Sequence, residues 1–309
     1  MKKSILLVLA FSLLFCTGMG AAPKQTSISL SPFSSVSIAG PLEVSFVSGS
    51  DYRVLITLEE PYMDYLVCRV EGRILVMDLD ERKVPADVRR QFRAKGTPNP
   101  VFSAVVYVPE PIQSVTLSGK SLLKDTEDVF DKARVNFDLS NNAAIQNLSL
   151  SSQAVKINMI NKSTAEINVS CQVFEAVTSN TANLRVDEDS EHSNYSLLGS
   201  SKVFSRSKSK QLDINAKGNS EMTVSGSGDS ATYVLGGTSE VNASAFEVPE
   251  AKVSMSSVCL LKQSAYKTLT VNLKGGSTLL FANEPQVIVE NIKSSTMSRM
   301  SGGAGAAKL

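Results

Sequence analysis

The feature of this chain that most constrains its fold is a degenerate repeat that runs from about residue 113 to about residue 300. Each unit contains a short alternating strand, a tight turn of Gly, Ser, Asn or Thr, a second short strand and a looser polar link. No heptad and no sustained 3.6-residue period runs through this region, which disfavours helical repeats. Each unit has too few apolar residues to fold alone, whereas stacked units can bury one continuous core.

The repeat length follows from the small residues at the centres of the turns. These lie at fairly even intervals, near Ser121, Ala143, Ala165, Ala182, Ser201, Ser220, Ser239, Cys259, Ser277 and Ser295, and the shortest interval separates Ala165 from Ala182. At about 3.3 Å per residue, such a unit has a perimeter of about 60 Å, and about ten units stacked ~4.8 Å apart give a rod roughly 50 Å long. The sequence therefore predicts an all-β parallel β-helix, or β-solenoid, over residues 113–300.

Glycine and serine recur at the turns because a corner needs positive φ and leaves little room for side chains. The residues expected to form this structural turn ladder are Gly119, Ser121, Gly218, Ser220, Gly236, Gly237, Ser239, Gly275, Gly276 and Ser277.

Residues 21–112 carry alternating strands without the repeat, and a hairpin is expected around Gly72. The other expected strands cover residues 33–38, 42–46, 52–58 and 101–108. Residues 80–100 form a basic insertion, in which 85–94 are expected to form one or two helical turns. A solenoid end must be capped against polymerisation, so we expect this N-terminal β region to cover one end. The glycine-rich tail, residues 301–309, is expected to be flexible.

The N-terminal segment 1–20 has the pattern of a signal peptide, with a basic start at Lys2 and Lys3 and an apolar run too short to span a bilayer. Cleavage after Gly20 or Ala22 fits the small residues there, and Pro23 favours Gly20. This pattern predicts an exported protein. Cys16 leaves a lipoprotein alternative open, although Phe15 is a poor match to the small residue that such processing favours. Membrane contact is expected only if Cys16 is lipidated.

Composition restricts the chemistry that the chain can perform. It has one His and a formal net charge of +1, so no global field favours nucleic acid. An odd set of cysteines would remain after export (Cys68, Cys171 and Cys259), which excludes complete pairing within one chain and favours buried thiols in strands.

Two neighbouring polar clusters are candidates for ligand sites. Residues 187–191 form an acidic run beside His192, and oxygen-rich runs can hold Ca²⁺, but the EF-hand spacing is absent and a solvated loop is favoured. The basic residues Lys202, Arg206, Lys208 and Lys210 of the next unit could pair with this run or simply face water.

Residues 226–231 fit the dinucleotide fingerprint, but a β segment follows where a helix is required, so a link between strands is favoured. No nucleophile elbow occurs, and a Ser-His-Asp triad would have to use His192. The sequence therefore predicts no catalytic, cofactor-binding or metal-binding residue.

Four segments together resemble a known family. They are residues 33–44, residues 49–54, residues 70–76, and Val108-Pro109 followed by residues 112–121. In their order and spacing they are similar to the auto-transporter adhesins with a head GIN domain, exported proteins of Gram-negative bacteria whose function is not established. The resemblance covers about residues 30–300. It implies pectin-lyase-like β-helical stacking, a role in adhesion or carbohydrate contact, and no catalytic residues. Several turns depart from it by losing glycine, as at Asn141 and Asn180.

These observations favour a non-catalytic binding or adhesion protein that presents a repetitive ladder surface to glycans or envelope proteins. A periplasmic location, the outer-membrane surface and secretion all remain open. The alternatives are a carbohydrate-active enzyme on a β-helix, which needs converging charged groups, and a periplasmic structural scaffold. The sequence does not identify the oligomeric state.

Overall fold

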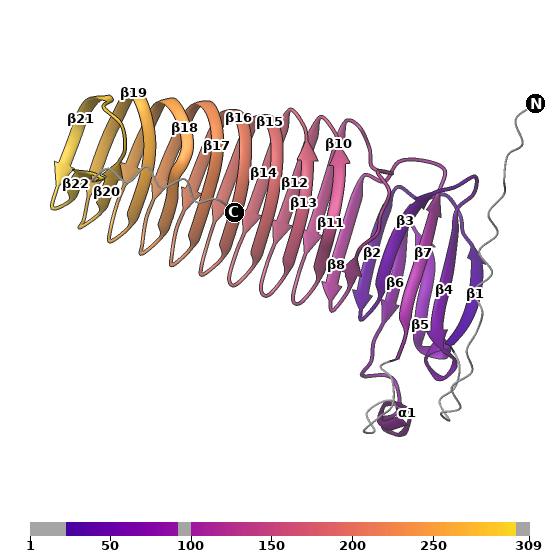
Figure 1. Ribbon diagram of the computed structural model, residues 1–309. Helices are drawn as coiled ribbons and strands as arrows, with labels where there is room; N and C mark the ends of the chain where they lie inside the picture. Colours follow the sequence, from indigo (N-terminus) through magenta and orange to yellow (C-terminus); the bar gives the residue numbers. More distant parts are fainter. Residues whose placement is uncertain (1–22, 92–99, 301–309) are drawn as a thin grey trace, which may run out of the picture.

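The computed structural model describes residues 23–91 and 100–300, which form an elongated rod of stacked strands (Figure 1). The chain makes a β-solenoid of about ten turns, so the predicted fold class is confirmed. The expected signal peptide, Cys16, the end of the basic insertion and the tail lie outside the described residues. Within the described part, no helix is both long and apolar enough to cross a bilayer.

The N-terminal region contributes seven strands, a 3₁₀ helix and a short α-helix. The strands are β1 (Pro23–Ser29), β2 (Ser35–Gly40), β3 (Glu43–Ser48), β4 (Arg53–Glu59), β5 (Leu66–Glu71), β6 (Ile74–Leu79) and β7 (Phe102–Val108). The 3₁₀ helix covers Glu60–Tyr65, and α1 (Ala86–Gln91) lies in the predicted helical segment. Strands β5 and β6 pair antiparallel, which confirms the expected hairpin.

The solenoid begins with short strands and continues with long ones. The short strands are β8 (Ser114–Gly119), β9 (Leu122–Leu123), β10 (Arg134–Leu139), β11 (Ala144–Ser151), β12 (Ala154–Met159), β13 (Thr164–Ser170) and β14 (Val173–Thr178). The long strands are β15 (Asn183–Leu197), β16 (Lys202–Ala216), β17 (Glu221–Leu235), β18 (Glu240–Met255) and β19 (Leu260–Lys274). The last coil contains β20 (Thr278–Phe281), β21 (Gln286–Lys293) and β22 (Thr296–Arg299).

The strands build two facing sheets that share the apolar interior. The first sheet runs through β1, β4, β7, β3, β9, β11 and β13 to the first halves of β15–β19, and then to β20 and β22. The second sheet runs through β5, β6, β2, β8, β10, β12 and β14 to the second halves of β15–β19, and then to β21. Parallel stacking already includes β2 and β3, which pair with β8 and β9.

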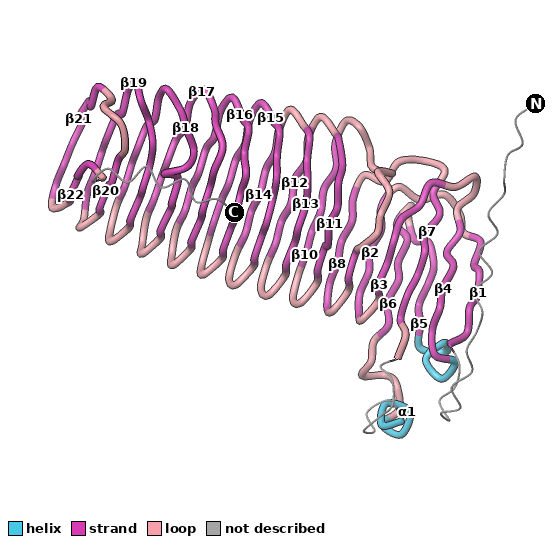
Figure 2. The backbone as a smooth tube through the Cα atoms, viewed as in Figure 1, coloured by secondary structure: helices cyan, strands magenta, loops and turns pink. Residues whose placement is uncertain are grey.

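The two edges of the rod are built differently. Along one edge each coil makes a tight turn, whereas at the other edge β15–β19 pass from the first sheet into the second as single bent strands (Figure 2). The looser polar links expected from the sequence are therefore absent between residues 183 and 274. In particular, the acidic run lies inside β15 rather than in a solvated loop, and residues 226–231 lie inside β17.

The register of the coils is nearly constant. Asn183 of β15 lies beside Lys202 of β16, and Lys202 lies beside Glu221 at the same position of β17. The prediction placed one turn centre at Ala165, but Ala165 pairs with Ile145 within the first sheet. The buried turn residue of the coil after Ala143 is Ser163. With the turn centre at Ser163 instead of Ala165, the spacing to Ala182 is no longer unusually short.

Each tight turn places at least one residue at positive φ, and the turn at Gly275 and Gly276 places two. In successive coils the first such residues are Gly119, Asn141, Asn161, Asn180, Gly199, Gly218, Gly237, Ser257 and Gly275, with φ between 60° and 79°. Asparagine replaces glycine where its short side chain can hydrogen-bond locally. Asn161 Nδ2 donates to Asn141 Oδ1 at 3.2 Å, and Asn180 Nδ2 donates to Asn161 Oδ1 at 2.8 Å.

Alternation along the strands fills the interior. Inward positions are aliphatic or aromatic in most coils and are almost completely buried. The ring of Phe130 contacts both Phe46 and Phe137, at centroid distances of 6.2 and 5.3 Å, and so joins the N-terminal strands to the first coils of the solenoid. This continuous core holds the outer faces of both sheets in register.

Candidate binding groove

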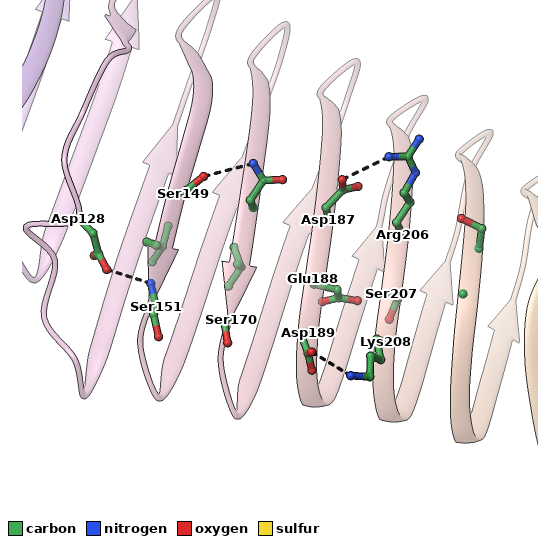
Figure 3. A pocket seen from close by; sticks show the side chains of 15 residues that line it. Asp128, Ser149, Ser151, Ser170, Asp187, Glu188, Asp189, Arg206, Ser207 and Lys208 are labelled. Carbon is green, nitrogen blue, oxygen red and sulfur yellow. Dashed lines mark hydrogen bonds and ion pairs between the residues drawn. The ribbon is translucent and has the colours of Figure 1, made fainter. Parts of the chain in front are cut away.

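A groove of about 830 Å³ crosses the outer face of the first sheet (Figure 3). Its volume lies within the range of about 300–1,000 Å³ that is usual for ligand sites. It extends over β11, β13, β15, β16 and β17, near the bent edge of the rod. Its lining consists of Asp128, Ser149, Leu150, Ser151, Asn168, Val169, Ser170, Asp187, Glu188, Asp189, Arg206, Ser207, Lys208, Ser225 and Gly226.

Strand alternation explains which side chains reach this groove. In β15, Asp187 and Asp189 are exposed, while Glu188 between them is buried. The same pattern places Arg206 and Lys208 of β16 outside and Ser207 inside. Because neighbouring coils are in register, each outward position forms a row that runs along the rod.

Opposite charges in the groove stand side by side on β15 and β16. Arg206 Nη1 lies 3.4 Å from Asp187 Oδ2, and Lys208 Nζ lies 3.3 Å from Asp189 Oδ2. A third pair, Lys210 Nζ to Glu191 Oε1 at 2.6 Å, continues the row beyond the groove. Arg206, Lys208 and Lys210 therefore do pair with the acidic run, whereas Lys202 pairs with Glu221 of β17, with 2.7 Å between Nζ and Oε2. Exposed pairs of this kind contribute only about 0–1 kcal/mol each, so they order the surface more than they stabilise the fold.

The N-terminal half of the groove is lined mainly by uncharged polar groups, and Asp128 is the charged side chain among them. Asn168 Nδ2 donates to Ser149 Oγ at 3.3 Å, and the backbone N–H of Ser151 donates to Asp128 Oδ2 at 3.3 Å. Asp128 also pairs with Lys132. Hydroxyl and carboxamide groups can both donate and accept, so this half offers mixed hydrogen bonding to a polar ligand.

Beneath the groove lies a buried polar cluster centred on Glu188. Tyr195 donates from its hydroxyl to Glu188 Oε1 at 2.8 Å and lies 3.0 Å from Ser205 Oγ. Burial raises the pKa of the Glu188 carboxyl, and the nearby hydroxyls of Ser207 and Ser193 oppose that rise only in part. Glu188 Oε2 makes no hydrogen bond of good geometry with the described residues. Glu188 is thus a carboxyl held in an environment that favours its neutral form.

This raised pKa predicts a pH-dependent stability. The folded state holds the Glu188 proton more tightly than the unfolded chain does. The stability that this carboxyl contributes is therefore fully present below its unfolded pKa and is lost as the pH rises through its folded pKa. Urea unfolding at a series of pH values should show a smaller fall in unfolding free energy across this window for Glu188→Gln than for the wild type. Glu166→Gln, at an exposed position of β13, controls for the loss of one carboxylate. Superimposable profiles for the wild type and Glu188→Gln would contradict this assignment.

The groove does not bring together the residues of a hydrolytic triad. His192 is exposed on the second half of β15, where it lies in register between Val173 and Gln211. Burial raises the pKa of Cys68 to about 11 and that of Cys171 to about 12, so both thiols stay protonated near neutral pH. Within residues 23–91 and 100–300, no three His, Cys, Asp or Glu side chains are grouped so that they could hold a metal ion.

The predicted turn residues lie at the tight edge and not in the groove. Gly119, Gly218, Gly237, Gly275 and Gly276 have positive φ, whereas Gly236 does not. The serines of the ladder, at positions 121, 220, 239 and 277, are buried below the surface. The ladder therefore shapes the coils, and the groove lies several residues further along each first-sheet strand.

Sequence reasoning did not find the groove. The signal that could have found it is the constant length of the coils, which places Asp187 opposite Arg206 and Asp189 opposite Lys208. A row of acids aligned in this way with a row of bases indicates two neighbouring outward rows rather than two loops.

The fold and the groove define a β-solenoid protein with a groove on one lateral face. A family model described as "Putative auto-transporter adhesin, head GIN domain" matches residues 32–203 and again residues 145–285. The chain belongs to this family, which confirms the resemblance seen in the sequence.

Solved structures with similar arrangements are known. One is a putative adhesin from Parabacteroides merdae, at 13% identity and a TM-score of 0.48, with 91% of this chain and 97% of that chain covered. Another is a putative lipid binding protein from Parabacteroides distasonis, at 14% identity and a TM-score of 0.46, with 91% and 98% covered. No curated protein matches this chain.

Proposed function

We propose that this protein is exported, is not an enzyme, and binds neutral glycans through the groove on its first sheet. The observation that carries the proposal is a groove that crosses five coils and is lined by hydroxyls, the Asn168 carboxamide and paired charges. At about 4.8 Å between coils, an elongated ligand along the rod axis meets a new polar row with each coil. A linear chain of sugars, which carries hydroxyls on every unit, has the chemistry to use such rows.

The charge balance supports an uncharged ligand. Arg206 and Lys208 are already paired with Asp187 and Asp189, and Asp128 is paired with Lys132. An anionic ligand would meet the acidic row, and a cationic ligand would meet the basic row. A neutral polyhydroxyl ligand is repelled by neither the acidic row nor the basic row and can form hydrogen bonds with both.

An aromatic ring stands beside the groove on the same outer face. Phe204 is 42% exposed and lies two residues before Arg206 of the groove. Arg185 of β15 stands over this ring at 5.7 Å, and Thr223 of β17 lies on the other side in register. An exposed aromatic ring whose position is fixed by a neighbouring side chain, here Arg185, can stack against the apolar face of a sugar ring.

Direct titration of the purified protein with neutral oligosaccharides tests this proposal. Phe204→Ala should weaken binding about tenfold, which corresponds to about 1.4 kcal/mol. The matched control is Val234→Ala, which truncates a 39% exposed apolar residue on the outer face of the second sheet and should leave affinity unchanged.

Other results of the same titration would overturn the proposal. Equal losses for Phe204→Ala and Val234→Ala would place the ligand elsewhere. Absence of binding across neutral glycans, with retention of an envelope protein instead, would favour a protein ligand or a scaffold. Turnover of any oligosaccharide would show a carbohydrate-active enzyme.

Export rests on the leader pattern and on the family. Labelling of intact cells with a reagent that does not cross membranes tests it. Labelling of the protein would indicate the outer-membrane surface, and labelling only after the outer membrane is opened would indicate the periplasm.

A further inference from the structure

The last coil of the solenoid carries core residues that no further described strand covers. Strand β21 lies in register on β19 and places three aliphatic residues beside fully buried ones. These pairs are Val287 with Leu269, Val289 with Val271, and Ile292 with Leu273. The β19 partners are 0% exposed, whereas Val289 is 51% exposed and Ile292 is 40% exposed. Positions that point into the buried core in the earlier coils are therefore exposed to solvent in this last coil.

The backbone at the same end is also unpaired on one side. Among the described residues, β21 pairs only with β19 and β22 pairs only with β20, so both sheets end in an open edge. An open edge beside exposed apolar side chains is a template for pairing with another chain. At the opposite end, the antiparallel strands and the 3₁₀ helix cover the core, with Tyr62 only 3% exposed.

We propose that a second copy of this chain covers this face, so that two rods join through their C-terminal coils. A two-fold axis perpendicular to both sheets places β21 antiparallel to the second copy's β21 and β22 antiparallel to its β22. That one operation completes both edges and buries the aliphatic residues of both copies, as an isologous interface requires. It is independent of the glycan proposal, because the groove lies on the side of the rod.

Charge and composition favour this occupant. The antiparallel arrangement brings Lys293, at the end of β21, to the beginning of the other copy's β21, which Glu284 precedes by two residues. Glu284 already pairs with Arg299 of its own chain at 2.9 Å, so Lys293 would share that carboxylate. Seven of the nine residues in 301–309 are Gly, Ala or Ser, and Leu309 is the one large apolar side chain, so this segment has little apolar bulk with which to fill the face.

Sedimentation of the purified protein over about 1–100 µM tests the proposal. The wild type should approach twice the mass of one chain as concentration rises. Val289→Asp should weaken the association at least tenfold, because it places a carboxylate in an apolar interface. The matched control is Ile288→Asp on the same strand, which points to the side of the rod and should leave the dimer intact.

Circular dichroism of each variant separates loss of association from loss of folding. A monomer at every concentration would overturn the proposal, as would equal effects of Val289→Asp and Ile288→Asp. Dimerisation that appears only after residues 301–309 are removed would also overturn it, because it would identify that segment as the cover.

Discussion

Gly226→Ala should lower the free energy of unfolding by about 2–4 kcal/mol, although it adds only one methyl group. Gly226 lies where β17 bends from the first sheet toward the second and has φ of 121°, a conformation that L-residues rarely adopt. A Cβ at this position would lie 2.0 Å from the backbone oxygen of Ser207 in the neighbouring coil. The neighbouring backbone cannot move aside, because parallel pairing with β15 and β17 holds it on both sides.

Gly236→Ala is the matched control for this prediction. Gly236 lies at the tight edge of the next turn without positive φ, and a Cβ there would approach no atom closer than 3.4 Å. Its effect should stay within about 0.5 kcal/mol. Urea unfolding followed by circular dichroism measures both variants. Equal stabilities for Gly226→Ala and Gly236→Ala would show that the coils do not approach each other as closely as described.

The solenoid could be predicted from the sequence because its signals are local. Short alternating runs on either side of small turn residues indicate strands, and their near-constant spacing indicates stacking. The hairpin around Gly72 was equally clear. Strand β1 was missed because Lys24-Gln25-Thr26-Ser27 has no apolar alternation. Its position depends on antiparallel pairing with β4, which is a contact between segments distant in sequence.

The continuous strands at the bent edge could not be predicted, because the polar composition of these segments is also typical of a loop. Between Asp187 and His192 the outward residues are charged, and the inward residues are Glu188 and Ser190. Exposed and buried residues therefore alternate along this segment, but the residue types do not show it because both kinds are polar. The inward polar groups are tolerated because they bond to one another: Ser190 Oγ lies 2.7 Å from Ser193 Oγ, and Tyr195 donates to Glu188.

The candidate site depends on register even more than the fold does. The sequence indicated that Arg206 and Lys208 could pair with the acidic run, but it also allowed both groups to face water separately. The difference depends on whether neighbouring units align without a shift, and this alignment is fixed by the interior and by the tight turns of every coil. No local pattern around Asp187 or Phe204 contains that information.

The groove is therefore a product of aligned coils, which makes removal of a whole coil the sharpest perturbation. Deletion of residues 183–201 joins Ala182 to Lys202 and preserves the register, because Asn183 lies beside Lys202 in the intact protein. A solenoid tolerates such a deletion, since each coil contacts mainly its neighbours. The shortened protein should fold, but it loses Asp187 and Asp189, so the basic row of β16 is left without its partners. We expect its affinity for neutral oligosaccharides to fall below detection.

Deletion of residues 240–259 is the control, because it removes one coil outside the groove and joins Ser239 to Leu260. The decisive measurement is oligosaccharide binding by the two deletion variants, each shown by circular dichroism to keep its β structure. If the stacked coils form a lateral glycan site, binding should be fully kept after deletion of residues 240–259 and lost after deletion of residues 183–201. Unchanged affinity after deletion of residues 183–201 would contradict that claim.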